Sequence, residues 1–108
     1  MAQMKAIRVD EFGDSGVLKL VEIERPSPDE GEVLIEVRAV GVNYADTMRR
    51  RNQYVVETTL PFVPGSEIAG VVAEIGPRVE DVGVGDRVVT LLGIGGYAEC
   101  TPWRRHGT

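Results

Sequence analysis

Two polar residues near the middle of the chain, Asn43 and Asp46, have types and a spacing that could serve chemistry. On a helix, residues three positions apart lie on the same face, so an amide and a carboxylate would stand side by side. Together they could orient a carboxamide group and a substrate oxygen. The same residues suit a structural role, because asparagine is favoured at a helix N-cap and a carboxylate in the first turn. The two roles are compatible.

A second stretch that could bind a cofactor is Gly93–Ala98, which matches the dinucleotide fingerprint G-x-G-x-x-A. That fingerprint must open a helix and precede an acidic residue about 20 positions later. Only ten residues follow Ala98, and Pro102 is one of them. The sequence therefore predicts a glycine-rich hairpin or loop here rather than a phosphate-binding turn.

The composition limits the class of protein. The chain has 108 residues, enough for one small domain, and a formal net charge of −5, which argues against nucleic acid as a partner. For the basic run Arg49–Arg51 we expect a solvated helix end rather than a phosphate contact. The N-terminus is charged and the chain has no long apolar run, which argues against a signal peptide and against a membrane anchor. The single cysteine, Cys100, cannot form an internal disulfide, and we expect a reducing, cytoplasmic setting.

The elements that must position these residues are short strands. Apolar or alternating runs bounded by glycine and proline predict strands over residues 4–12, 17–25, 32–40, 67–75 and 87–92, with a further strand starting at 97–99. Residues 44–51 lose the alternation and predict one or two turns of helix, and residues 52–65 predict a loop. About six short strands and one helix are typical of a small barrel or sandwich.

Two strands carry finer signals. In residues 32–40, Val33, Ile35 and Val37 share one face, whereas Leu34 falls on the other face with charged residues. Such alternation predicts a half-buried strand. Gly70, inside residues 67–75, indicates a bulge or a close approach of two backbones.

Four motifs occur in an order that is more specific than the pattern of a generic β domain. They are Gly41–Asp46, Leu60–Val72, Gly85–Val88 and Gly95–Glu99. In this combination the chain, from about Met4 to Glu99, resembles the GroES-like domain of the medium-chain dehydrogenase/reductase superfamily. Within it, the likeness is to the quinone oxidoreductase (zeta-crystallin-like) branch. The resemblance implies a mainly β fold, a GroES-like, partly open β-barrel of short strands with one short helix near residues 44–51.

The resemblance also implies which residues surround the site. In this branch, the residues at the positions of Asn43 and Asp46 lie beside the nicotinamide cleft, and the tyrosine at the position of Tyr54 lines it. For Tyr54 the alternative is ordinary packing with the hydroxyl at the surface. The branch often has tyrosine where Met48 stands, and methionine cannot donate a proton. Glu67 corresponds to a supporting residue.

Zinc alcohol dehydrogenases of the same superfamily carry cysteine where Asn43 stands and histidine where Ser66 stands. Catalytic zinc needs thiolate, imidazole or carboxylate ligands, and an amide and a hydroxyl are poor replacements. One cysteine cannot build a four-cysteine structural site, and the one histidine is His106. We therefore expect no metal site.

For an intact enzyme of this branch, the resemblance implies hydride transfer from NADPH to a quinone or an α,β-unsaturated carbonyl without zinc. Such enzymes also have a Rossmann domain, which these residues do not contain. We expect residues 1–99 to form an incomplete GroES-like domain and the polar, basic residues 100–108 to form an atypical tail. We interpret the chain as an N-terminal fragment or a truncated or frame-shifted product, with very weak cofactor binding and no useful turnover alone.

Two functions of other classes stay open at this point. A co-chaperonin-like module has the same architecture, although a shared fold does not carry function. A small interaction domain could instead form a homodimer through an unpaired barrel edge. Trp103, in the tail, is either an exposed aromatic residue or a cover for that edge.

Overall fold

The computed structural model describes residues 2–104, which form two antiparallel sheets. The smaller sheet pairs two strands that are separated by a single 3₁₀ turn, η1 (Ser15–Val17): β1 (Gln3–Val9) and β2 (Leu18–Glu24). The larger sheet has the order β5-β4-β3-β6, with β3 (Glu32–Gly41), β4 (Glu67–Ile75), β5 (Arg87–Leu91) and β6 (Cys100–Arg104). Within residues 2–104 one α-helix forms, α1 (Tyr44–Arg50).

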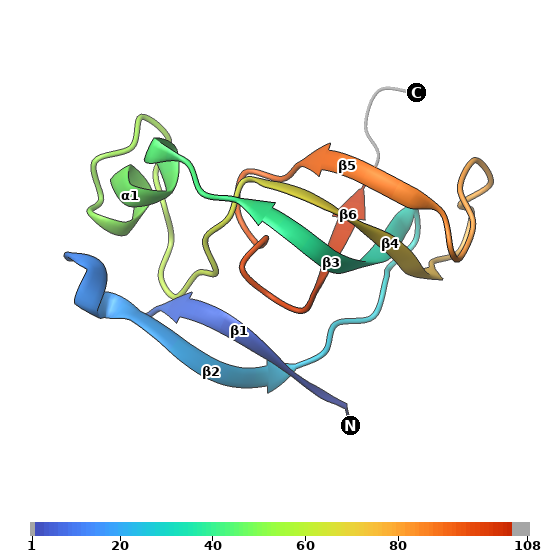
Figure 1. Cartoon of the computed structure of the whole chain (residues 1–108), viewed down its shortest axis with the longest axis horizontal. Helices are drawn as coiled ribbons and strands as arrows, with labels where there is room; N and C mark the ends of the chain where they lie inside the picture. The colour runs from blue at the N-terminus through green and yellow to red at the C-terminus, as the bar shows by residue number, and fades with distance from the viewer. Residues whose placement is uncertain (1, 105–108) are drawn as a thin grey trace.

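The two sheets lie one below the other in Figure 1, with α1 beyond the end of β3 and the β4–β5 turn at the opposite end. Isolated bridges, Ala6 with Ala98 and Val9 with Phe62, connect the small sheet to neighbouring loops. Between residues 2 and 104, no strand ladder joins the sheets into a closed barrel. The predicted mainly β, GroES-like, partly open fold with one short helix is therefore confirmed. The described chain has no helix long and apolar enough to span a membrane.

The last strand differs from the prediction. The structure places β6 at Cys100–Arg104 and leaves residues 97–99 outside any strand, because residue 98 makes only a single bridge to β1. The prediction of a strand at 97–99 is therefore wrong by three residues. β6 pairs antiparallel with the first half of β3, so residues 100–104 of the expected tail belong to the sheet. Residues 105–108, with His106, lie outside the described residues.

The core is built around the first half of β3, where residues 33–35 are buried on both faces of the strand. On one face Val33 and Ile35 pack against residues of β4. On the other face Leu34, with 0% of its surface exposed, packs with Met4 of β1 and Cys100 of β6. Burying one leucine side chain contributes about 1.5–3 kcal/mol. The prediction of a half-buried strand is wrong at Leu34, because the smaller sheet covers that face.

Gly70 marks both a bulge and a close backbone approach, as predicted. It pairs with Val37, next to a register shift between Val37 and Ala39. A Cβ atom at Gly70 would overlap the carbonyl oxygen of Glu36 and lie 2.7 Å from Cγ2 of Ile35. Glycine at this position therefore lets β3 and β4 approach each other closely.

Trp103, on β6, is half-buried and packs against the core cluster. It stands opposite Val33 in the β3–β6 ladder. The alternative of an exposed tail aromatic is therefore wrong. The indole covers part of the core, and β6 as a whole pairs with the edge of β3.

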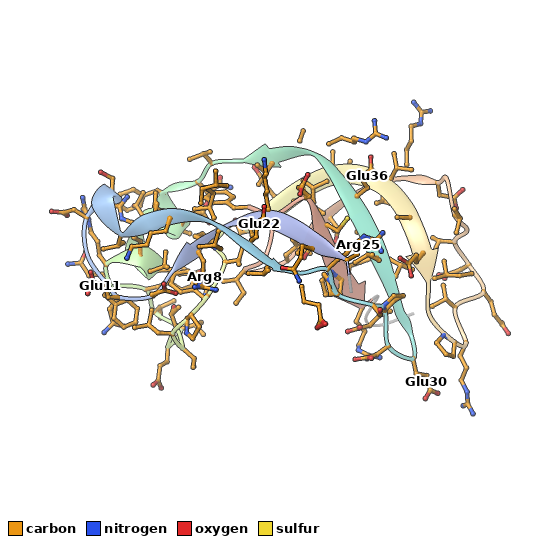
Figure 2. The ribbon with its side chains drawn as sticks, turned by 90° about the horizontal axis from the view of Figure 1, so that it is seen from below. Arg8, Glu11, Glu22, Arg25, Glu30 and Glu36 are labelled. Atoms are coloured by element: carbon orange, nitrogen blue, oxygen red, sulfur yellow. The ribbon has the colours of Figure 1, made fainter. Side chains whose placement is uncertain are left out.

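Arg25 marks the passage from the smaller sheet to the larger one (Figure 2). Its guanidinium forms an ion pair with the carboxylate of Glu74 on β4. The hydrogen bond to Glu74, together with the nearby Cys100 side chain, raises the pKa of Arg25 above its usual value. Arg25 therefore remains charged and links the connecting segment to β4.

Candidate functional site

The candidate site is centred on the point where the chain passes from β3 to α1. Asn43 has extended backbone angles, φ −120° and ψ 155°, and is the N-cap of α1. Its backbone N–H donates to Oδ2 of Asp46 at 3.0 Å, which is the carboxylate half of a capping box. The predicted places of Asn43 at the N-cap and of Asp46 in the first turn are therefore confirmed.

Asp46 is buried, with 5% of its surface exposed, although it carries a carboxylate. Its Oδ2 also accepts a hydrogen bond from the hydroxyl of Tyr97 at 2.8 Å. Its Oδ1 is shielded from solvent and has no hydrogen-bond partner among residues 2–104. Burying a charged group is costly unless hydrogen bonds compensate for the lost water. The two donors on Oδ2 therefore determine whether Asp46 is tolerated at this position.

Tyr97 is the residue of this site that the sequence does not single out, although it lies inside the motif Gly95–Glu99. Burial raises the pKa of Tyr97 to about 12, and the hydrogen bond and charge of Asp46 add to the increase. Its phenol therefore stays protonated and serves as a donor. Its backbone N–H donates to the carbonyl of Pro64, and its carbonyl accepts from the N–H of Ile7, each at 2.8 Å. Tyr97 thus joins α1, β1 and the loop before β4.

Ser66, immediately before β4, meets the side chain of Asn43. Nδ2 of Asn43 donates to Oγ of Ser66 at 3.4 Å, which is a long and weak hydrogen bond. Both residues are half-buried. The pair presents neutral donors and acceptors at the border between the interior and solvent. Such a pair can orient a carboxamide or a carbonyl oxygen.

Tyr54 lies apart from this pair, in the loop after α1. The guanidinium of Arg49 lies over its ring, 4.3 Å from the centroid, which is a cation–π contact. Within residues 2–104 the hydrogen bonds of Asn43 and Asp46 go to each other, to Ser66 and to Tyr97, and not to Tyr54. The structure thus brings Asn43 and Asp46 together and places Tyr54 with Arg49.

The basic run Arg49–Arg51 is only partly a solvated helix end. Arg50 is buried, with 8% of its surface exposed, and its Nε donates to the carbonyl of Gly13 at 3.1 Å. The N–H of Gly13 donates in turn to the carbonyl of Arg50 at 2.9 Å. The prediction is wrong for Arg50, because the segment between β1 and β2 covers it. Arg51 pairs with the exposed Asp14 at 3.6 Å.

The stretch Gly93–Ala98 is a loop without helix, as predicted. The N–H groups of Gly95, Gly96 and Tyr97 donate to carbonyls of Val63–Gly65 at 2.7, 3.0 and 2.8 Å. A phosphate-binding turn must leave such groups available to its ligand. In this chain they hold the loop against the segment before β4, so the stretch does not form a dinucleotide site.

Two open hollows flank the site, and neither is lined by Asn43, Asp46 or Tyr54. One, of about 540 Å³, lies between β1, β2 and the end of β3, and its wall includes Tyr97. The other, of about 720 Å³, lies against β3, β4 and β5, and its wall includes Glu67. The described residues therefore present the Asn43–Ser66 pair at the surface rather than inside an enclosed cleft.

The donors available at the site do not suit a catalytic metal. In the described part of the chain, no group of three histidine, cysteine, aspartate or glutamate side chains could hold an ion. At the centre of the site stand an amide and a hydroxyl, whereas catalytic zinc is held by thiolate, imidazole or carboxylate. The residues present therefore do not fit zinc.

The chain is similar in sequence to enzymes of one family. Residues 29–107 match the model for the alcohol dehydrogenase GroES-like domain. A quinone oxidoreductase of Lama guanicoe is 47% identical over 98 residues, which are 89% of this chain and 30% of the relative. The chain thus spans less than a third of that relative.

Solved structures extend the likeness to the fold. A mycobacterial protein in complex with NADPH is 43% identical, with a TM-score of 0.83, over 93% of this chain and 31% of that chain. A cobalt- and zinc-bound alcohol dehydrogenase from Pyrobaculum aerophilum is 36% identical, with a TM-score of 0.86, over 95% of this chain and 40% of that chain. Since the likeness of fold includes a metal-bound protein, the donor set of the site is the better guide to metal binding.

Proposed function

Since the chain belongs to the alcohol dehydrogenase GroES-like domain family, in the quinone oxidoreductase branch of the medium-chain dehydrogenases/reductases, we propose that it is the substrate-side domain of an NADPH-dependent oxidoreductase. The substrate class is a quinone or an α,β-unsaturated carbonyl. The observation that carries the proposal is the Asn43–Ser66 pair, which stands at the N-terminus of α1 where the two neutral side chains meet at 3.4 Å.

NADPH, when bound, supplies the hydride, and the protein supplies orientation and electrostatics. The amide of Asn43 has both a donor and an acceptor, so it can pair with a carboxamide of the cofactor. The hydroxyl of Ser66 can hold the Asn43 amide or donate to a substrate oxygen. Asp46 contributes by accepting the hydrogen bond from the backbone N–H of Asn43. Tyr54, with Arg49 over its ring, is proposed to line the outer wall of the nicotinamide cleft.

This chemistry needs no zinc in our proposal. Because an amide and a hydroxyl do not fit the metal, activation of the substrate depends on hydrogen bonds and placement. The proton that follows the hydride can come from water, and Met48, which stands where the branch often has tyrosine, cannot donate it. The buried free thiol of Cys100 suits the reducing cytoplasm in which we place the protein.

We propose that a nucleotide-binding domain completes the enzyme. The chain corresponds to 30% of the Lama guanicoe relative, and the N–H groups of its glycine-rich loop are occupied by backbone carbonyls. The 108 residues alone should therefore bind NADPH weakly, in the millimolar range or above, and show no useful turnover. Isothermal titration that gave micromolar binding would contradict this expectation.

A chimera tests the activity itself. Residues 1–104 would replace the corresponding segment of the mycobacterial relative, whose remaining part supplies the other domain. We expect NADPH oxidation that depends on an added quinone, and Asn43→Ala should lower kcat/KM about tenfold or more, since positioning is worth several kcal/mol. Gln53→Ala, an exposed change near the site, is the control. A folded chimera that binds NADPH but reduces neither quinones nor enones would refute the proposal.

One observation favours a second candidate, a dimer formed through the unpaired edge of the larger sheet. β5 is an edge strand in which Val89 is 83% and Leu91 76% exposed, and exposed apolar edges invite pairing. Size-exclusion chromatography with light scattering would detect the dimer. If Val89→Lys converted a dimer into a monomer, this edge would be the interface.

A further inference from the structure

The position of Asn43 depends on a chain of contacts that ends at Tyr97. Asn43 is held by its backbone N–H on Asp46 Oδ2 at 3.0 Å, and the same oxygen accepts the Tyr97 hydroxyl at 2.8 Å. The other oxygen of Asp46 has no partner among the described residues. The Tyr97 hydroxyl is thus the side-chain donor in residues 2–104 that holds this buried carboxylate. Removing this hydroxyl would leave Asp46 with one of the two hydrogen bonds to its Oδ2.

Tyr97 is itself fixed by two backbone hydrogen bonds and by the contact of its ring with Gly65. Its backbone N–H and carbonyl are bonded to Pro64 and Ile7, on two different segments. Its ring lies against Gly65, where a Cβ atom would be 2.7 Å from Cδ1 of the ring. Gly65 has a φ of +108°, a conformation that glycine adopts without strain. The ring is therefore seated on a backbone that only glycine suits, next to Ser66.

We propose that Tyr97 is a positioning residue: its hydroxyl, acting through Asp46, fixes the first turn of α1 and so holds the Asn43 amide beside Ser66. Its significance for catalysis rests on the proposed function, whereas the contact itself does not. The backbone of Tyr97 is bonded to Ile7 of β1 and to Pro64 before Ser66, and its hydroxyl is bonded to Asp46 of α1. Tyr97 therefore links the first turn of α1, next to Asn43, with the segment that leads to Ser66.

The chemistry of the contact requires a hydroxyl and not only a ring. Phenylalanine at position 97 would fill the same volume but leave Asp46 with one donor instead of two. A buried acceptor that loses its donor is costly, so the first turn of α1 would open more often. The core around β3 should be unaffected, since Tyr97 is not among the side chains that pack there.

The experiment uses the 108-residue chain without ligand. Tyr97→Phe, Asp46→Asn and the control Tyr44→Phe, at a tyrosine that is 76% exposed, are compared by amide hydrogen exchange and by ultraviolet titration of the phenols. In Tyr97→Phe, we expect the Asn43 N–H to exchange about tenfold faster, as the loss of one hydrogen bond predicts. The N–H of Val72, which is bonded to the carbonyl of Asp86, should keep its rate.

The titration gives a second readout of the contact, at the phenol itself. Wild type should show one phenol that titrates near pH 12, because the pKa of Tyr97 is raised to about 12. Tyr97→Phe should remove this late step, and Asp46→Asn should move it to lower pH while the domain stays folded. An Asn43 exchange rate that is unchanged in Tyr97→Phe would overturn the proposal.

A final arm separates this inference from the proposed function. Nuclear magnetic resonance spectra of the wild type and of Tyr97→Phe would be recorded with millimolar NADPH. Shifts at Asn43 and Ser66 that weaken in the variant support both conclusions. If the chimera with the wild-type residues binds NADPH but reduces neither quinones nor enones while the exchange result holds, the proposed function fails and the positioning contact stands. Equal shifts in both proteins would refute the positioning role.

Discussion

Substituting Gly70 by alanine should be among the most damaging single-methyl additions to this domain. The new Cβ atom would overlap the Glu36 carbonyl oxygen and lie 2.7 Å from Cγ2 of Ile35, well inside the 3.4 Å at which ordinary contact begins. The main obstacle is backbone at the centre of the β3–β4 pair, so it cannot turn away. Overpacking costs about 1–3 kcal/mol, and we expect about 3 kcal/mol here.

Two other glycines make the argument specific. A Cβ atom at Gly41 would also collide, but with the side chain of Glu67, whose Cγ and Cδ would be 2.7 Å away. Because Glu67 can rotate aside, we expect a cost below about 1 kcal/mol. At Gly83 nothing lies within 4 Å, so Gly83→Ala should be neutral or stabilise by up to about 1 kcal/mol.

The assays are urea unfolding and thermal unfolding of the three variants, each followed by circular dichroism or tryptophan fluorescence. For a domain of this size, a loss of 1 kcal/mol lowers Tm by about 4–8 °C, so Gly70→Ala should lose more than about 10 °C. Gly41→Ala should lose only a few degrees. If Gly70→Ala and Gly41→Ala proved equally stable, the reasoning from the identity of the colliding atom would be refuted.

Three further predictions concern the core, a buried cation and pH. Leu34→Ala should cost about 2–5 kcal/mol, because the side chain is fully buried, whereas Leu91→Ala, at 76% exposure, should change the unfolding free energy by less than about 0.5 kcal/mol. Arg50→Met should cost about 1–3 kcal/mol in denaturant titrations by leaving the Gly13 carbonyl without its Nε donor; no loss would mean that water replaces it. The pKa of Tyr97 rises from 10.0 to about 12 on folding, so its contribution is complete below pH 10 and is lost as the pH rises to about 12. Solvent screening of a half-buried group limits this to about 1 kcal/mol, which Tyr97→Phe should abolish in unfolding curves at pH 9 and pH 12.

The fold was predictable wherever local pattern and pairing agree. The strand over residues 67–75 follows from an apolar run bounded by turn residues. The helix predicted over residues 44–51 and observed over 44–50 follows from the loss of alternation, and the role of Gly70 follows from its place inside a strand. Leu34 could not be assigned from alternation, because its burial depends on β1, a strand distant in sequence. β6 was missed for a similar reason: its polar composition resembles a tail, and only pairing with β3 makes it a strand.

The site was predictable only in part. Asn43 and Asp46 could be identified because their spacing predicts a shared helix face and a cap, and the structure confirms the cap. Arg50 could not, since a basic run reads as solvent-exposed until the segment around Gly13 covers it. Tyr97 is separated from Asp46 by 51 positions, a distance at which no local pattern signals contact.

Asp46 shows why its chemical type alone does not determine its role. A carboxylate near a cofactor invites the interpretation of a base, which requires access to the proton that it would take. In this fold Asp46 is 5% exposed, and its bonded oxygen already accepts two donors. The accessible group is the amide of Asn43, which cannot titrate. In our proposal, the buried Asp46 carboxylate therefore holds the backbone of Asn43, the neutral amide of Asn43 contacts the ligand, and the Tyr97 hydroxyl keeps the carboxylate in place.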